Sequence, residues 1–300
     1  MANFTVECVV DAKDKLGESA FWCPDEAALY WLDVPAPARI HRWSPGSGKH
    51  DTWDVPELVS SMAKRRDGRL LVASLSGLNV FDPKDGSFRR VAAPEAGKPQ
   101  NRSNDGAPDA KGRFWYGTMQ NNMGPRGEFL DAPPPVGILY KVEPDFRVVP
   151  MESGQGVPNA TAWSLDNKTM YFADTLQGTI FAYDFDLELG AISNKRIFTK
   201  EGPGYPDGAC IDAEGCLWNA RWEAGAVVRY TPEGRIDRII EVPARRVTSC
   251  CFGGAGLETL YITSSRIHLT EDDLQDQPAA GGVFAVQPGV SGIERPYFGT

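Results

Sequence analysis

The chain has 300 residues, of which 31 are Lys or Arg and 40 are Asp or Glu, so its formal net charge is −9. A chain this acidic is not expected to bind nucleic acid or an anionic membrane surface. No stretch approaches the roughly 20 apolar residues that a membrane span requires, and the N-terminus does not resemble a secretory signal. We therefore expect a cytoplasmic protein, a monomer or weak homo-oligomer, that acts on a small molecule.

Several common catalytic patterns are absent from the sequence. The three histidines, His41, His50 and His268, form no HxH or HExxH pattern, which argues against a histidine-rich zinc site. There is no GxSxG, GxGxxG or GxxxxGK[ST] segment, so serine-hydrolase and phosphate-loop chemistry have no support. The six cysteines include no CxxC pair, and we expect them to be reduced thiols.

Strand-like segments repeat along the chain. Residues 3–10 predict one strand, and six runs rich in aromatic and β-branched residues then recur about 40 to 50 residues apart, with one longer interval. We expect each run to be the inner strand of a unit, followed by a second and a third strand, with Asp-Gly, Asn-Lys or Glu-Gly turns nearby. The runs are residues 29–33, 70–74, 114–118, 170–174, 217–221 and 260–264.

Six such units predict an all-β fold, a six-bladed β-propeller that forms a single domain over residues 1–300. Little sequence remains after the last repeat, so the N-terminal strand is expected to close the last blade and remove its open edge. The longer interval contains residues 120–136, rich in Pro, Gly and Asn. This segment is either a tolerated surface insertion or a lid beside the site.

Propellers bind ligands where loops of several blades meet at the mouth of the central channel. Polar residues stand at a similar distance before four of the six runs: Glu18, the pair Asn104 and Asp105, Asn159 and Asp207. Equal offsets in a cyclic repeat would bring these side chains together at one level of the channel. Carboxylate and amide oxygens suit Ca²⁺, Mg²⁺, Mn²⁺ or Fe²⁺, with Zn²⁺ possible. Each segment alone could also be an ordinary turn.

These segments make the chain resemble the senescence marker protein/gluconolactonase family, also called regucalcin-like. The resemblance covers nearly the whole chain, and the motifs arrive in order. They are 16–18 (LGE), 102–106 (RSNDG), 117–119 (GTM), 158–164 (PNATAWS), 192–196 (ISNKR), 206–208 (PDG) and 249–254 (SCCFGG). The resemblance implies a six-bladed propeller that hydrolyses sugar lactones with one divalent metal ion, Ca²⁺ first among the candidates.

The resemblance also implies roles for individual residues. Glu18, Asn159 and Asp207 would hold the metal, and Asp207 would in addition activate the attacking water. Arg102 and Asn104 would contact the sugar lactone.

Three positions differ from the family pattern. Ala160 follows Asn159 where relatives often have glycine, and Gln120, Asn121 or Asn122 replaces a substrate-contacting glutamate. We expect Asn122 to contact the substrate. Arg221 stands where many relatives have a smaller or neutral residue, and it either lines the pocket as a further substrate residue or is a salt-bridged surface arginine.

The residues leave other functions open. The expected substrates are aldonolactones such as glucono-, xylono-, arabino- or galactonolactone. A metal-dependent phosphotriesterase or esterase would use a similar oxygen cage, and a calcium-binding regulator would need the metal site alone.

Overall fold

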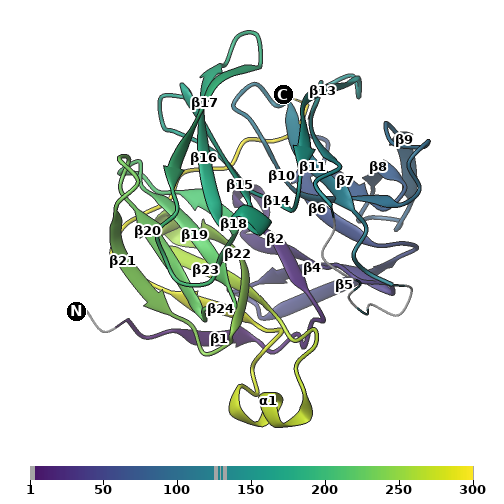
Figure 1. The fold of residues 1–300 in the computed structure, drawn as a ribbon. Coiled ribbons are helices and arrows are strands. Elements are labelled where there is room, and N and C mark those ends of the chain that lie inside the picture. Colours follow the sequence, from purple (N-terminus) through teal and green to yellow (C-terminus); the bar gives the residue numbers. More distant parts are fainter. Residues whose placement is uncertain (1–3, 125–127, 129, 131–133, 300) are drawn as a thin grey trace.

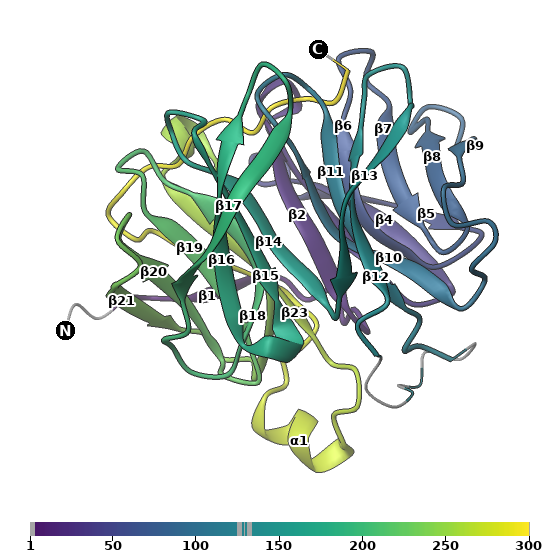
Figure 2. The same cartoon turned by 45° about the horizontal axis from the view of Figure 1, so that its top comes forward.

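The computed structural model describes residues 4–124, 128, 130 and 134–299. Its strands form six four-stranded sheets, which stand in a ring around a central channel (Figures 1 and 2). The predicted all-β fold, a six-bladed β-propeller, is therefore confirmed.

Each blade is an antiparallel sheet whose four strands follow one another in order from the channel to the outside. From the innermost strand outward, the six blades are β2 (Gly17–Cys23), β3 (Ala28–Asp33), β4 (Ala38–Ser44) and β5 (Lys49–Val55); β6 (Val59–Lys64), β7 (Leu70–Ser74), β8 (Gly77–Phe81) and β9 (Phe88–Ala92); β10 (Asn101–Pro108), β11 (Phe114–Gln120), β12 (Gly137–Val142) and β13 (Val148–Gln155); β14 (Pro158–Trp163), β15 (Thr169–Asp174), β16 (Thr179–Asp186) and β17 (Ala191–Thr199); β18 (Tyr205–Ile211), β19 (Leu217–Trp222), β20 (Ala226–Tyr230) and β21 (Ile236–Glu241); and β22 (Arg246–Gly253), β23 (Thr259–Ser265), β24 (Val283–Val286) and β1 (Glu7–Val10).

The last blade takes its outermost strand from the other end of the chain. β1 pairs antiparallel with β24, with Glu7 opposite Ala285 and Val10 opposite Val283. The N-terminal strand thus closes the ring as predicted, and it covers the edge that β24 would otherwise expose. The strand is shorter than the predicted 3–10, and residues 1–3 lie outside the described residues.

The prediction of which strand is innermost was wrong. The aromatic runs form the second strand of each blade, for example β3 and β11, and a fourth strand precedes each of them on the channel side. The second strand is packed between neighbouring blades on both faces, which explains its continuous apolar sequence. All six residues of β3 are buried, whereas the outermost strand β17 is largely exposed.

Apolar packing fills each interface between neighbouring blades. Six separate clusters of buried side chains lie in the described chain, and each joins residues of two adjacent blades. One cluster joins Phe21 and Tyr30 of the first blade to Met62 and Val72 of the second. Another joins Trp22 and Trp31 to Tyr261 of the last blade, across the closing interface. Apolar contacts between neighbouring blades therefore hold the ring together.

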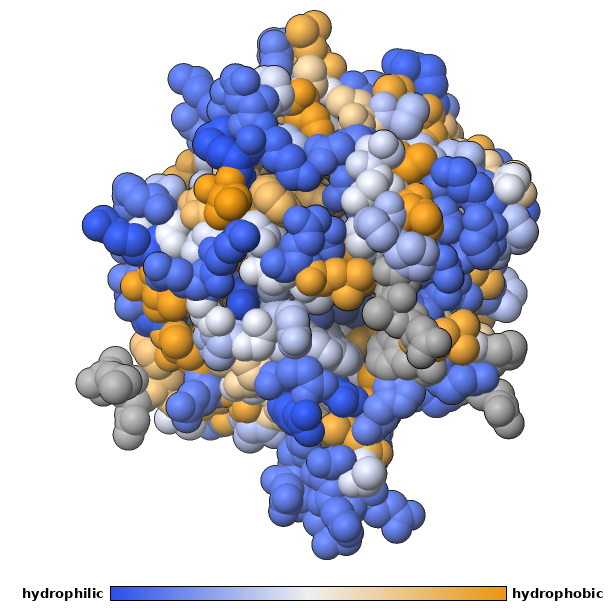
Figure 3. All heavy atoms as spheres, viewed as in Figure 1, coloured by the Kyte–Doolittle hydropathy of each residue, from blue (hydrophilic) through white to orange (hydrophobic). Residues whose placement is uncertain are grey.

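Short helices occur only in the connections of the described chain: three 3₁₀ turns, η1 (Pro24–Glu26), η2 (Thr175–Gln177) and η3 (Ala255–Leu257), and one α-helix, α1 (Glu271–Asp276). α1 projects from the ring between β23 and β24 and is strongly hydrophilic (Figures 1 and 3). Hydrophobic residues are scattered over the face drawn in Figure 3. No described helix is long and apolar enough to cross a membrane. The cytoplasmic location and the oligomeric state stay predictions.

Candidate functional site

All six innermost strands are irregular at the same level of the channel. In each, the pairing with the second strand shifts register, at Glu18/Phe21, Val59/Ser61, Ser103/Gly106, Asn159/Ala162, Pro206/Ala209 and Val247/Ser249. A bulge of this kind turns a side chain out of its normal alternation. The predicted metal-binding residues therefore lie on the innermost strands themselves, and not in connections before them.

Two of these bulges hold a non-glycine residue in a left-handed conformation. Ser19 has a φ of 54° and Ala160 a φ of 55°, and each directly follows a predicted metal ligand, Glu18 or Asn159. A side chain in this region costs about 1–2 kcal/mol. Such backbone strain is concentrated at functional sites in many proteins.

Glu18 lies on β2 and Asp207 on β18, two of the innermost strands. Burial and then the Asp207 carboxylate raise the pKa of Glu18 well above its usual value. Burial and then the Asp105 carboxylate do the same to the pKa of Asp207. Neither Glu18 nor Asp207 forms an ion pair with a basic side chain in the described part of the chain. The charge of Arg102 acts favourably on both carboxylates, but it offsets the effects of burial and like charge only in part.

Hydrogen bonds connect the amides of Asn104 and Asn159 to the blade that carries Asp207. Asn104 Nδ2 donates to Pro158 O at 2.9 Å and to Asn159 Oδ1 at 3.3 Å. Asn159 Nδ2 donates to Thr175 Oγ1 at 2.8 Å, and that hydroxyl donates to Pro206 O at 2.7 Å. This series of hydrogen bonds holds the Asn159 side chain in place and links the third, fourth and fifth blades.

Arg102 is buried beside these amides. Its Nη1 donates to Asn104 Oδ1 at 2.7 Å, and its Nε and Nη2 donate to Asn122 Oδ1 at 3.3 and 2.9 Å. Burial lowers the pKa of Arg102 to about 10, so the guanidinium still carries its charge at neutral pH. The structure therefore brings three of the four predicted substrate residues into direct contact.

Arg221, the fourth predicted substrate residue, is buried and is not a surface arginine. Its Nε donates to Pro203 O at 2.8 Å, its Nη2 to Gly204 O at 3.2 Å and its Nη1 to Asn219 Oδ1 at 3.1 Å. These bonds hold the connection that leads into β18 and Asp207. A direct role of Arg221 toward substrate stays a prediction.

The segment 120–136 reaches the same end of the channel through Asn122. Met123 is buried in the cluster between the first two blades, and Leu130 N donates to Asn122 O at 2.8 Å. Residues 125–127, 129 and 131–133 lie outside the described residues, so the choice between insertion and lid rests on the described part alone. That part is packed against the predicted substrate residues.

The donor set suits a hard divalent cation. No group of three or more His, Cys, Asp or Glu side chains among the described residues is arranged to hold a metal. The predicted set lies outside that description because it consists of two carboxylates and one amide. Carboxylate and amide oxygens are ligands that Ca²⁺ prefers, and a 2+ charge would offset the repulsion between Glu18 and Asp207.

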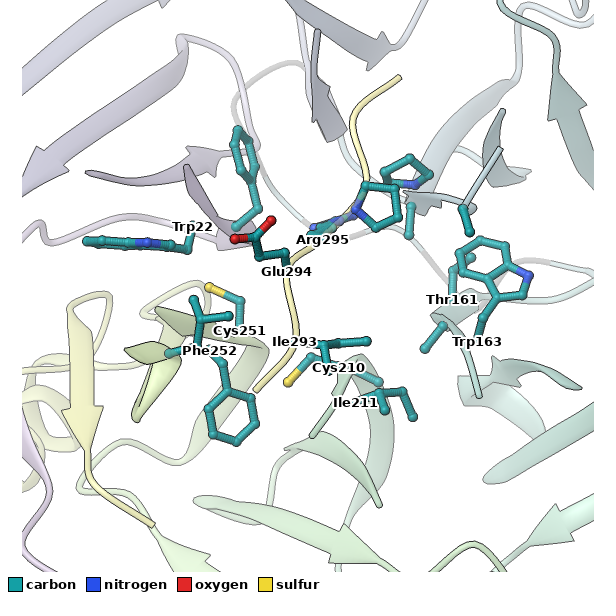
Figure 4. Close-up of a pocket in the computed structure, with 18 of the residues that line it drawn as sticks. Trp22, Thr161, Trp163, Cys210, Ile211, Cys251, Phe252, Ile293, Glu294 and Arg295 are labelled. Carbon is teal, nitrogen blue, oxygen red and sulfur yellow. The ribbon is translucent and has the colours of Figure 1, made fainter. Parts of the chain in front are cut away.

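A cavity of about 240 Å³ lies at the opposite end of the innermost strands (Figure 4). Its walls are largely apolar, and no predicted site residue lines it. They include Trp22, Thr161, Trp163, Cys210, Phe252 and, from the C-terminal segment, Ile293, Glu294 and Arg295. Trp163 also packs in the apolar cluster between the third and fourth blades.

Sequence reasoning missed two residues beside the predicted site. Asp105 was only a candidate within its motif, although its Oδ2 accepts the Thr161 amide hydrogen at 3.0 Å. Arg295 was not considered, and its guanidinium donates to Ala20 O and Gly106 O on two innermost strands. The repeat could not reveal Arg295, because it follows the last strand and has no counterpart in other blades.

Comparisons with known proteins find similarity over nearly the whole chain. Residues 16–266 match the family model described as SMP-30/Gluconolactonase/LRE-like region. A 6-deoxy-6-sulfogluconolactonase from Pseudomonas putida is 36% identical over 298 residues, which cover 99% of both chains. A pentonolactonase from Haloferax volcanii is 35% identical over 300 residues, 98% of this chain and 97% of that protein.

A solved structure is also similar over almost its whole length. The calcium-binding protein regucalcin from Agrobacterium tumefaciens superposes with a TM-score of 0.91 at 30% identity, covering 99% of both chains. Together with the match over residues 16–266, this similarity extends the sequence resemblance to the complete propeller. The chain belongs to the SMP-30/gluconolactonase/LRE-like family.

Proposed function

We propose that this protein hydrolyses sugar lactones to aldonic acids in a reaction that depends on one divalent metal ion. The observation that carries the proposal is the pair of buried carboxylates, Glu18 and Asp207: neither forms an ion pair among the described residues, and the charge of Arg102 offsets their raised pKa values only in part. Glu18, Asn159 and Asp207 would hold the ion.

The relatives support both halves of the proposal. Two of them are named as lactonases, one for a sulfonated gluconolactone and one for pentonolactones. The structural relative is named as a calcium-binding protein. We therefore place Ca²⁺ first, followed by Zn²⁺, Mn²⁺, Mg²⁺ and Fe²⁺, and we expect glucono-, xylono-, arabino- or galactonolactone as substrate.

The chemistry can be assigned to groups of this chain. A bound divalent cation would polarise the lactone carbonyl and acidify the attacking water. Asp207 accepts the proton that this water loses as its oxygen bonds to the carbonyl carbon. When the ring C–O bond breaks, the same proton passes to the departing ring oxygen, so that lactone and water give one aldonic acid.

Substrate orientation falls to the contacting side chains of the third blade. Arg102 is held by Asn104 and Asn122, so its guanidinium keeps one direction at the channel mouth. A polyhydroxylated ring presents many hydrogen-bonding oxygens, which a fixed set of amide and guanidinium groups can orient. Arg221 supports the connection that leads to Asp207, and its contact with substrate is the weaker part of this proposal.

A pH-indicator assay of metal-stripped protein tests the function. Aldonolactones are supplied one at a time, and Ca²⁺, Mg²⁺, Mn²⁺, Fe²⁺ and Zn²⁺ are added back singly. We expect turnover only after a metal is restored. Turnover that is indifferent to chelation would refute the metal dependence. Metal binding with no lactone turnover would favour the calcium-binding alternative, and cleavage of phosphotriesters or simple esters alone would favour the esterase.

A further inference from the structure

The side chain of Arg295 lines the cavity at the opposite end of the innermost strands and links two of these strands from there. Its Nη1 donates to Ala20 O at 3.3 Å and its Nη2 donates to Gly106 O at 2.9 Å. Ala20 lies two residues after Glu18 on β2, and Gly106 lies two residues after Asn104 on β10. One guanidinium thus joins the bulged segments of the first and third blades.

Asp105 extends this connection to the fourth blade. Its Oδ2 accepts the Thr161 amide hydrogen at 3.0 Å, and Thr161 lies two residues after Asn159. Ala160 stands between them with a φ of 55°, so this hydrogen bond holds a strained stretch of backbone in place. The positive charge of Arg295 also acts favourably on the Asp105 carboxylate.

The positions of these bonds follow one rule. In each of three blades, the bonded backbone group lies two residues after a group assigned to metal or substrate, namely Glu18, Asn104 or Asn159. Apolar clusters hold the blades together further out, between neighbouring sheets. At the axis, the planar guanidinium donates along two fixed directions of one rigid fork, whereas a lysine ammonium is a compact point charge on a flexible stem.

We infer that Arg295 and Asp105 are positioning residues of the proposed lactonase site, and that they set the backbone on which Glu18, Asn104 and Asn159 are carried. This inference rests on the proposed function. Groups that orient metal ligands from behind commonly change metal affinity 10- to 100-fold when they are removed. Arg295, at the opposite end of the innermost strands, would then control the affinity of the proposed site for its metal ion.

The rest of the C-terminal segment is anchored independently of Arg295. Phe298 N donates to Lys64 O at 2.8 Å and Gly299 N donates to Gly112 O at 2.9 Å. Tyr297 donates its hydroxyl hydrogen to Asp25 Oδ2 at 2.8 Å. Removal of the Arg295 guanidinium should therefore leave this segment in place, which makes a substitution at position 295 interpretable.

The first test measures metal affinity directly. Calorimetric titration of metal-stripped protein with Ca²⁺ compares the wild type with Arg295→Met, Arg295→Lys and the exposed neighbour Glu294→Gln as the matched control. We expect roughly 10- to 100-fold weaker binding for both Arg295 variants and no change for Glu294→Gln. Wild-type affinity in Arg295→Met would overturn the inference, and so would wild-type affinity in Arg295→Lys, because the inference requires the two hydrogen bonds of the guanidinium.

The second test does not depend on metal. Hydrogen exchange of the metal-free proteins is followed in peptides that cover 17–23, 101–108 and 158–163. In Arg295→Met, we expect these peptides to exchange roughly tenfold faster than in the wild type. In Asp105→Ala, we expect the same acceleration in the peptide 158–163. Peptides of β7 and β23 should stay unchanged in both variants. Unchanged exchange in all three peptides would overturn the inference. If the wild type binds no metal, the proposed function fails, and this measurement still decides the role of Arg295.

Discussion

Two buried aspartates of the fifth blade, Asp207 and Asp212, differ in whether the protein supplies a partner for their charge. Asp212 accepts hydrogen bonds from Arg229 Nε and Trp218 Nε1, both at 2.8 Å, and from the backbone N–H groups of Glu214 and Cys216, both at 2.9 Å. Asp207 forms no ion pair with the described basic residues, and burial and a second carboxylate raise its pKa.

The difference distinguishes carboxylates that stabilise a blade from those that belong to the proposed ligand site. A buried charge that serves the fold is paired within the protein, because an unpaired one costs several kcal/mol. Asp109 in the third blade repeats the arrangement of Asp212, with Arg113 and Trp115 as its donors. Glu18 and Asp207 depart from this rule together, since neither forms an ion pair among the described residues and the charge of Arg102 offsets their raised pKa values only in part. The proposed metal ion would supply the missing positive charge.

The largest effect is expected from Asp207→Asn. The amide cannot accept the proton of the attacking water and binds a cation weakly, so kcat/KM should fall by at least about a thousandfold. The stability of the metal-free protein should be unchanged or higher, since one member of a repelling buried pair is gone. Steady-state lactone hydrolysis and urea unfolding in the presence of a chelator measure the two effects. Normal turnover in this variant would refute the assignment of Asp207.

Asp212→Ala should show the reverse pattern. It leaves Arg229 buried without its central partner, so we expect a loss of about 3–5 kcal/mol in the free energy of unfolding. Under conditions where the variant remains folded, its Ca²⁺ affinity should stay within a few-fold of the wild type. A variant that unfolds normally but no longer binds metal would erase the distinction between the two aspartates.

Glu26 sharpens the comparison through pH. Burial alone would raise its pKa, but hydrogen bonds from Lys64, Tyr30 and Arg42 outweigh burial and lower it from 4.5 to about 2. A carboxylate with a lowered pKa in the folded state stabilises the protein above the unfolded value and loses that contribution as pH falls toward 2. Because the group is partly exposed, Glu26→Gln should cost about 1–2 kcal/mol at pH 7.

The cost of Glu26→Gln should shrink as pH falls below 4.5, which urea unfolding at a series of pH values can follow. A cost that is constant down to pH 2 would show that the carboxylate charge contributes nothing there. The lactonase activity at pH 7 serves as the control and should not change, since Glu26 lies outside the predicted set.

The smallest effect concerns backbone strain at the site. Ala160→Gly removes a side chain from a residue with a φ of 55° but adds freedom to the unfolded chain, so the net stabilisation should be about 0.5–1 kcal/mol. Thermal unfolding of the metal-free protein measures it. Metal affinity should be retained, because Asp105 continues to hold the Thr161 amide. A clear loss of stability would mean that Ala160 is not strained.

The repeat made the fold predictable, but it misplaced the innermost strands. Residues 29–33 and their counterparts attract attention because they are buried on both faces, and that places them second from the axis. The innermost strands face a polar channel and are bulged, so they lack a regular alternation. Their equal spacing nevertheless predicts that Glu18, Asn104, Asn159 and Asp207 belong to equivalent positions of four blades, and the structure has each of them on an innermost strand.

Contacts that depend on three-dimensional closure could not be predicted. The guanidinium of Arg221 donates hydrogen bonds to the carbonyl groups of residues 203 and 204, and nothing in the sequence of its own strand indicates these bonds. Arg295 reaches the channel from a segment without regular structure, so neither periodicity nor spacing points to it. Such residues become visible only when the six blades are assembled.

The most direct test of the account is the anomalous difference density of crystals equilibrated with Mn²⁺. A single strong peak is expected at the channel mouth, bounded by oxygens of Glu18, Asn159 and Asp207, and it should vanish in Asp207→Asn. No peak at that place in well-ordered crystals, or a peak held by other residues, would contradict the claim that these unpaired carboxylates form a metal site.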